Sequence, residues 1–227
     1  MLPTHISIIM DGNGRWAAKH GRERLFGHNN GVQSVRDCCE AAVEMGIKYL
    51  SLYAFSEENW NRPQKEVEGL MSLMMKSVLE ERPTFEKNNI RFRVVGNRSR
   101  LSPELVAKIE EVEAETASYD RLDLIIMLSY SGKWDILQAA RRCIEENDGT
   151  PLTAEAFEKR LATAGIPDPD LLIRTSGEQR LSNYMLWQCA YTEFYYTDVL
   201  WPDFRKEDFR RAIEAFEKRN RRYGEII

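Results

Sequence analysis

The sequence predicts an α/β protein built on a single six-stranded, mainly parallel sheet flanked by helices. Six short apolar segments recur along the chain, and segments with helical periodicity lie between them. Several of the apolar segments run directly into glycine-rich or polar residues, as strands do at the ligand-binding edge of a parallel sheet. We find no repeat, linker or low-complexity segment, so we expect residues 1–227 to form a single domain.

The first predicted strand covers residues 6–10 and ends in a carboxylate, Asp11, with Gly12 and Gly14 close behind. Glycines let backbone N–H groups approach an anion, and a helix starting near Asn13 would add its dipole. An aspartate beside a bound phosphate needs a cation between them, which indicates Mg²⁺. The alternative is an ordinary strand–turn–helix in which Asp11 caps the helix.

A basic segment, residues 22–28, follows. Arg24 and His28 are four residues apart and would share a face if this segment is helical. They would then be further donors for the same anion, whereas a solvated turn is the alternative. A helix is predicted over residues 29–45.

The second strand, residues 48–55, runs into a loop of serine, asparagine, tryptophan and arginine at residues 56–63. If the two strands are parallel, both ends face one crevice, and this loop joins Asp11 there.

A long helix is predicted over residues 64–88, and Pro83 should kink or end it. Its apolar residues cover more than the single stripe of a surface helix. The helix is therefore either buried on two sides or the wall of an apolar tunnel. Its methionines suit a wall that adapts to a flexible apolar ligand.

The remaining elements continue the alternation of strands and helices. The segment 122–128 is the most apolar and is expected at the centre of the sheet. The predicted strands are residues 90–96, 122–128, 170–174 and one that begins at Glu193, and the predicted helices are 103–119, 132–146, 153–164 and 207–223. The basic end of the last helix, residues 218–222, complements the helix dipole, with a membrane-surface contact as the alternative.

A second polar constellation follows the fifth strand. Arg174 and Arg180 are six residues apart, with the hydroxyls of Thr175, Ser176 and Ser182 around them. Arginine and hydroxyl donors in this combination are typical of a diphosphate or sulfate site.

Composition excludes several classes of protein. The net charge of −4 gives no electrostatic case for nucleic acid. Four cysteines without a CxxC pair indicate reduced thiols in a cytoplasmic protein rather than a zinc site. No apolar run approaches the ~20 residues of a membrane span, and no signal peptide precedes the first strand, whose abrupt start suggests a missing short extension.

Four segments in order form a specific pattern: MDGNGRW at 10–16, YAFSEENWNRP at 53–63, RTSGEQRLSN at 174–183 and DVLWPDF at 198–204. Together they resemble the cis-prenyltransferases, and within them the bacterial undecaprenyl diphosphate synthases. The resemblance implies a homodimer that adds isopentenyl diphosphate to farnesyl diphosphate with Z double bonds, using Mg²⁺. The product would be a polyprenyl diphosphate carrier for cell-wall synthesis. The absence of a DDxxD motif agrees with this family.

The resemblance also implies a set of site residues. Asp11 and Asn59 would be catalytic, and Asp11 and Glu193 would hold the metal, the latter directly, through water or from the dimer mate. The residues implied for the allylic diphosphate are Gly12, Asn13, Gly14, Arg15, Arg24 and His28. Further substrate contacts are implied for Trp16, Ser56, Glu57, Glu58, Trp60 and Arg62, and isopentenyl diphosphate binding for Arg174, Arg180, Leu181 and Ser182. Gln179 stands where some relatives carry histidine.

Two points stay open at this stage. Asn59 is a weak base, so it either accepts the proton or positions substrate while the released diphosphate takes the proton. The enzyme is expected in the cytoplasm. Because its product is a membrane lipid, peripheral contact at the inner membrane face stays open.

Rival functions fit less well. A phosphatase with Asp11 as nucleophile would need a second aspartate two residues on, where the chain has Asn13. A non-catalytic subunit of a prenyltransferase pair would have lost the Asp11 carboxylate.

Overall fold

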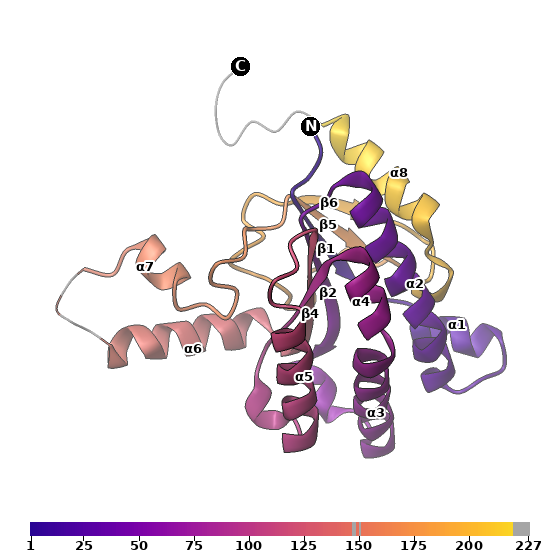
Figure 1. Cartoon of the computed structure of the whole chain (residues 1–227), viewed down its shortest axis with the longest axis horizontal. Helices are drawn as coiled ribbons and strands as arrows, with labels where there is room; N and C mark the ends of the chain where they lie inside the picture. Colours follow the sequence, from indigo (N-terminus) through magenta and orange to yellow (C-terminus); the bar gives the residue numbers. More distant parts are fainter. Residues whose placement is uncertain (147–148, 150, 220–227) are drawn as a thin grey trace.

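The computed structural model describes residues 1–146, 149 and 151–219, and within them six parallel strands form one sheet (Figure 1). The sheet order is β3-β4-β2-β1-β5-β6, so the first two strands of the chain lie in the middle. The strands are β1 (His5–Ile9), β2 (Tyr49–Ser56), β3 (Ile90–Val95), β4 (Leu122–Tyr130), β5 (Leu171–Arg174) and β6 (Glu193–Tyr196). The predicted six-stranded parallel sheet is confirmed, and every strand pair in it is parallel.

Helices connect the strands, and α6 and α7 project away from the sheet, to the left in Figure 1. The helices are α1 (Asn13–Lys19), α2 (Arg24–Met45), α3 (Gln64–Glu80), α4 (Arg82–Asn88), α5 (Pro103–Glu115), α6 (Gly132–Glu145), α7 (Ala154–Glu158) and α8 (Lys206–Glu217). Three 3₁₀ helices add to them: η1 (Glu57–Asn61), η2 (Arg98–Arg100) and η3 (Trp201–Asp203). No helix in the described part of the chain is both long enough and apolar enough to cross a membrane.

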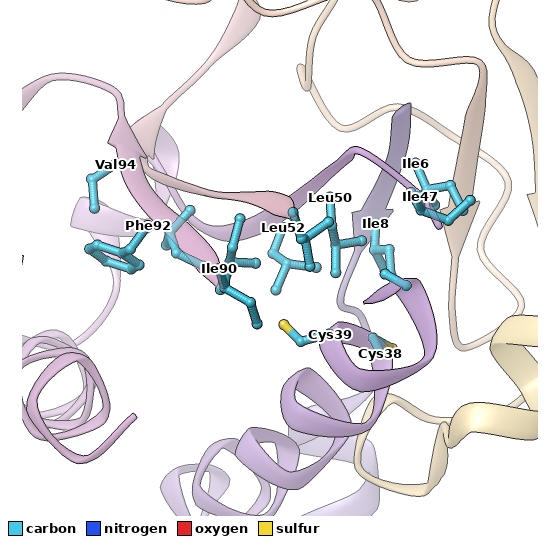
Figure 2. Packing of buried hydrophobic residues seen from close by; sticks show 14 of the residues in the cluster. Ile6, Ile8, Cys38, Cys39, Ile47, Leu50, Leu52, Ile90, Phe92 and Val94 are labelled. Carbon is cyan, nitrogen blue, oxygen red and sulfur yellow. The ribbon is translucent and has the colours of Figure 1, made fainter. Parts of the chain in front are cut away.

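One face of the sheet packs against α2, α3, α4, α5 and α8. Side chains alternate along each strand, so Ile6, Ile8, Leu50 and Leu52 all point to this face. Figure 2 shows them above Cys38 and Cys39 of α2, with β3 side chains completing the layer. Both thiols are buried, all four cysteines are free, and burial raises the pKa of the Cys39 thiol to about 12.

The opposite face of the sheet contains a buried polar network. Ser7 and Ser51 lie on neighbouring strands and share hydrogen bonds with each other and with the Tyr184 hydroxyl. The His5 ring lies 2.9 Å from Ser51 Oγ and 2.6 Å from the Pro167 carbonyl oxygen. Burial lowers the pKa of His5 to about 4, more than the Pro167 hydrogen bond and the charge of Asp170 raise it.

One predicted helix start needs correction. The segment around Arg24 and His28 is helical, because α2 begins at Arg24 rather than at residue 29. The prediction missed these residues because Gly27 weakens helical propensity. Here it lets α2 approach α1 so closely that a Cβ at this position would lie 2.0 Å from the Asn13 carbonyl oxygen.

The predicted interruption at Pro83 is confirmed. The helix ends at Glu80 and a second one starts at Arg82, so Pro83 stands in a first turn where its missing N–H is tolerated.

Other element boundaries also differ from the predictions. The strand β4 is interior but lies second from the edge, because β2 and β1 occupy the middle. The helices predicted over 103–119 and 153–164 end early, at Glu115 and Glu158. The last helix ends at Glu217, and the basic residues predicted at 221 and 222, like most of the predicted turn at 147–151, lie outside the described residues.

The middle of the sheet should dominate stability. Ile6 lies on the middle strand β1 and is fully buried in the core between the sheet and its helices. We expect Ile6→Ala to lower the free energy of unfolding by about 2–5 kcal/mol, measured by urea denaturation. The exposed Leu2 is the control, and Leu2→Ala should stay within about 0.5 kcal/mol of the parent. Equal losses in both variants would contradict this account of the core.

Candidate active site

Three strands end together at one edge of the sheet. Ile9 of β1 pairs with Arg174 of β5 on one side and with Tyr53 of β2 on the other. Asp11, two residues beyond Ile9, therefore meets Arg174 and the end of β2, as the parallel arrangement predicted.

The Asp11 carboxylate accepts hydrogen bonds from both sides. Arg174 Nη2 donates to Oδ2 over 2.9 Å, and the Gly12 N–H donates to Oδ1 over 2.7 Å. Arg15 Nη2 lies 3.6 Å from Oδ1. Burial alone would raise the pKa of Asp11, but Arg174, the Gly12 N–H and the charge of Arg15 outweigh it and lower the pKa below its usual value. The carboxylate is therefore held ionised while 31% of its side chain stays exposed.

The backbone around Asp11 is fixed by a close approach. Gly12 has φ of 109°, and a Cβ there would come within 3.0 Å of Leu200 Cδ2 and Ser176 Cβ. The Asp11 carbonyl accepts hydrogen bonds from Thr175 Oγ1 at 2.6 Å and from a backbone N–H at 3.1 Å. Glycine is required at position 12 by this turn, whatever anion the loop binds.

Arg174 organises the second loop. Its side chain is only 3% exposed, and Nη1 donates to the Arg180 carbonyl and to Ser182 Oγ at 2.8 Å. Ser176 and Ser182 adopt left-handed backbone conformations, with φ of 76° and 51°, which are costly for non-glycine residues. Strain of this kind is typical of loops that hold polar groups for a function.

Two exposed arginines are bridged by one carboxylate. Glu178 accepts a hydrogen bond from Arg180 and lies 3.5 Å from Arg15, which also donates to Ser176 Oγ at 2.5 Å. Arg180 is 61% exposed. A bound anion would compete with Glu178 for these guanidinium groups.

A third cationic group comes from α2 and from the residue that follows η1. Arg24 and Arg62 both contact Glu66 Oε1, at 3.2 and 3.1 Å. His28 lies among them, and its buried Nε2 has no hydrogen-bond partner. Burial, then the charges of Arg62 and Arg24, lower the pKa of His28 to about 4, although Glu66 raises it. His28 is thus neutral, and its Nε2 can form a hydrogen bond with a ligand.

Asn59 has its amide oxygen occupied. Ser56 and Asn59 form a reciprocal cap of η1: the Asn59 N–H donates to Ser56 Oγ at 3.2 Å, and the Ser56 N–H donates to Asn59 Oδ1 at 3.1 Å. The oxygen that would accept a proton is therefore already an acceptor, and the amide nitrogen is the group left to meet a ligand.

A deep cavity of about 430 Å³ starts at these groups. Its mouth is polar and includes Asp11, Asn59, Arg62, Arg174 and Arg180. Its inner wall is mainly apolar and runs between the sheet and the α2–α3 pair. The apolar lining includes Val32, Val35, Leu52, Ala54, Leu70, Met71, Met74, Val78, Phe92, Leu124 and Ile126. The methionine-rich helix predicted from the sequence is one side of this cavity.

Several predicted site residues do not line the cavity. Glu57 accepts hydrogen bonds from Ser129 and Arg100, and the Trp60 ring packs under the same Arg100 at 4.9 Å. Glu58 accepts from Asn183 at 2.6 Å. Trp16 donates to Asp203 at 2.7 Å and stacks on Phe26, and Leu181 packs among buried residues of the opposite face. These residues support the loops that carry the site.

Glu193 lies at the other end of its strand. It pairs in register with Leu171, at the start of β5, whereas Asp11 lies beyond the end of β5. Its carboxylate is bound by Arg219 at 2.8 Å. Through Leu171, Glu193 is level with Ile6, five residues before Asp11 and two strands away, so within one chain Glu193 does not meet Asp11.

Some residues that hold the site in place are not predicted by the sequence. Thr175 and Ser176 are predicted only as hydroxyls near the arginines, yet Thr175 donates to the Asp11 carbonyl and Ser176 accepts from Arg15. The sequence also does not predict Glu66 and Glu178 as partners of the arginines. Their signal in the sequence was weak, because an acidic residue near arginines is common on any surface.

The donor set around Asp11 determines which kind of Mg²⁺ site can form there. No cluster of three or more histidine, cysteine, aspartate or glutamate side chains occurs among the described residues. Mg²⁺ often binds through one or two carboxylates together with substrate phosphates and water. One ionised, partly exposed carboxylate beside arginines fits that mode and does not fit a closed structural metal site.

Comparison with known proteins shows one consistent relationship. A family model described as "Putative undecaprenyl diphosphate synthase" matches residues 9–224. The isoprenyl transferase of Chromobacterium violaceum is 49% identical over 98% of this chain and 88% of its own length. A ditrans,polycis-undecaprenyl-diphosphate synthase of Haemophilus influenzae, named as specific for (2E,6E)-farnesyl diphosphate, is 47% identical over 98% of this chain and 95% of its own.

Solved structures agree with the sequence matches. Lavandulyl diphosphate synthase from Lavandula x intermedia, in complex with dimethylallyl diphosphate, superposes with a TM-score of 0.94 at 35% identity, over 99% of both chains. A probable undecaprenyl diphosphate synthase from Campylobacter jejuni gives 0.84 at 35% identity, again over 99% of both chains.

The neutral His28 ring makes stability depend on pH. The unfolded chain binds a proton near pH 6.5 and the folded chain only near pH 4, so the free energy of unfolding falls as the pH drops between these values. The slope of this free energy against pH reports how many protons the chain takes up on unfolding. We expect His28→Gln to lower that number by up to one, measured by urea denaturation at several pH values.

His5, buried elsewhere with a pKa also near 4, is the matched comparison. His5→Gln should reduce the slope by a similar amount, and the double variant by the sum, since the two rings lie on opposite faces of the sheet. An unchanged slope in His28→Gln would show that this ring is protonated in the folded protein.

Proposed function

The chain belongs to the undecaprenyl diphosphate synthase family of prenyltransferases, and on this basis we propose that it condenses isopentenyl diphosphate units onto farnesyl diphosphate with Z stereochemistry. The product is a polyprenyl diphosphate. One observation carries the proposal: an ionised aspartate and buried arginine stand at the mouth of a deep, mainly apolar cavity. A diphosphate with a long hydrocarbon tail has this same division between a charged head and an apolar chain.

The arginines divide between two diphosphate sites. Arg24 and Arg62 lie on the α2 side of Asp11 and, with the turn at residues 12–15, suit the allylic diphosphate. Arg15 of this turn reaches Ser176 and Glu178 of the second loop, so it lies between the two sites. On the other side, Arg174, Arg180 and Ser182 suit isopentenyl diphosphate. Holding both substrates at one sheet edge brings the alkene of one next to the reacting carbon of the other, which is mainly a positioning task.

Loss of diphosphate from the allylic carbon leaves a cation-like centre and concentrates negative charge on the leaving group. The guanidinium groups stabilise that charge at fixed positions. His28, neutral and unpartnered at Nε2, can hydrogen-bond the leaving group without adding charge.

Asp11 would hold Mg²⁺, with diphosphate oxygens and water as the other ligands. The ion would neutralise the leaving diphosphate, as metal ions do in phosphate chemistry. Arg174 keeps Asp11 ionised and oriented for this role. Glu193 can join such a site only from a second chain, because its own strand places it at the far end of the sheet.

The proton lost from the isopentenyl unit goes to the released diphosphate. The Asn59 oxygen already accepts the Ser56 N–H, so its free amide nitrogen suits hydrogen bonding to a diphosphate oxygen. Asn59 is accordingly a positioning residue for the diphosphate that receives the proton.

A homodimer is the expected assembly. Large apolar side chains remain exposed on the projecting α6 and beyond it, including Leu137 at 66% and Ile144 at 77%. Residues seven apart on a helix share a face, and exposed apolar side chains on one helix face are typical of protein interfaces. Because the product is a lipid, the proposal also includes peripheral contact of the enzyme with a membrane surface.

The assay that tests the function uses farnesyl diphosphate, labelled isopentenyl diphosphate and Mg²⁺, with and without chelator. We expect labelled lipid products that vanish with chelator. Asp11→Ala should lower the rate by roughly 10²–10³-fold or more, because the leaving group loses its metal. Glu80→Ala, an exposed position on α3, is the control and should keep full activity. Phosphate release without isopentenyl diphosphate would indicate a phosphatase and contradict the proposed prenyltransferase function.

Ala54 tests whether the cavity holds the growing chain. It lies on β2 and lines the cavity, so Ala54→Leu places a branched side chain where hydrocarbon would pass. We expect shorter products, measured by chromatography of the dephosphorylated lipids. Ala114→Leu adds the same side chain to the exposed face of α5 and should leave the length unchanged. Unchanged lengths in Ala54→Leu would place the chain elsewhere.

A further inference from the structure

An ion pair between α2 and the α3–α4 junction lines the cavity. Arg36 of α2 donates from Nη2 to Glu81 Oε1 at 2.5 Å and from Nε to Oε2 at 3.3 Å, a two-pronged contact. Both residues line the cavity that begins at Asp11. Arg36 follows His28 by eight residues, about 12 Å of helix at 1.5 Å per residue.

The surroundings of the pair change from apolar to polar. Val35, Cys39 and Val78 line the neighbouring wall, whereas Ser77 and Thr84 line it beside Glu81. The Arg36 side chain is 40% exposed and Glu81 13% exposed, so the pair reaches from the cavity to bulk water. The pair therefore places two opposite charges on the cavity wall at a point that solvent also reaches.

The backbone at Glu81 is a joint between two helices. Glu81 stands between the end of α3 and the start of α4, where Pro83 prevents a continuous helix. Its neighbour Arg82 fastens the joint to α5 through Glu111 at 2.8 Å and Glu115 at 3.2 Å. Arg82 does not line the cavity, so the joint has one contact facing the cavity and one facing away from it.

We propose that the Arg36–Glu81 ion pair is a gate that limits product length. As five-carbon units are added at the mouth, the apolar end of the chain advances along the cavity until it meets this pair. Hydrocarbon pressed against the pair would remove water from two charges without replacing their hydration. Further growth then requires the pair to separate and the α3–α4 joint to yield.

The proposal rests on the proposed polyprenyl synthesis and adds its length-determining residues. It differs from a simple steric floor, because a floor depends on side-chain volume and the gate depends on opposite charges. Exchanging the two charges keeps the attraction, whereas removing either one abolishes it and opens the wall.

The experiment compares Arg36→Ala, Glu81→Ala and the exchange variant Arg36→Glu/Glu81→Arg in the full-length enzyme. Total incorporation of labelled isopentenyl diphosphate and the distribution of product lengths are both measured at fixed detergent concentration. We expect each single alanine variant to shift the main product upward by at least one five-carbon unit. The exchange variant should return the distribution toward that of the parent.

Arg82→Gln is the matched control, because it breaks ion pairs at the adjacent residue of the same joint outside the cavity. It should keep the parental product length, and thermal unfolding should verify that all variants are folded. An equal upward shift in Arg82→Gln, or parental lengths in both alanine variants, would overturn the gate. Absence of incorporation in the parent enzyme would instead refute the proposed function, so the two failures are distinguishable.

Discussion

The contact between Asp11 and Arg174 is the interaction on which the site depends. These residues end neighbouring strands, and their 2.9 Å hydrogen bond fixes both loops at one edge of the sheet. Arg174 is nearly fully buried, and removing its partner would leave an uncompensated charge there. The same guanidinium holds Ser182 and the Arg180 carbonyl, so a single side chain sets the geometry of the second loop and the ionisation of Asp11.

The cavity combines three environments. At its mouth, guanidinium groups are paired with Glu66 and Glu178, which keep them in place and yield to a more highly charged ligand. Along α2 the wall from Val32 to Cys39 is mainly apolar, and the Arg36–Glu81 pair adds two opposite charges to it. One diphosphate with a growing hydrocarbon chain would experience all three zones in succession.

How much of this was predictable differs between residues. Asp11 and Arg174 were predicted because each stands at the end of an apolar strand, and the ends of parallel strands meet at one edge of the sheet. Trp60 and Glu57 share the same sequence motif as Asn59, yet they turn toward Arg100 and away from the cavity. Spacing within a 3₁₀ turn does not reveal which side chain faces inward, since the cap formed by Ser56 and Asn59 decides it.

The sequence by itself determined the alternation of strands and helices, the interruption at Pro83 and the two polar loops, because these follow from local periodicity and from proline and glycine chemistry. Only the tertiary structure decided the sheet order, the helical start at Arg24, the neutral state of His28 and the pairing of Arg36 with Glu81. Each of these depends on contacts between residues distant in the chain, where burial and neighbouring charges override local preference.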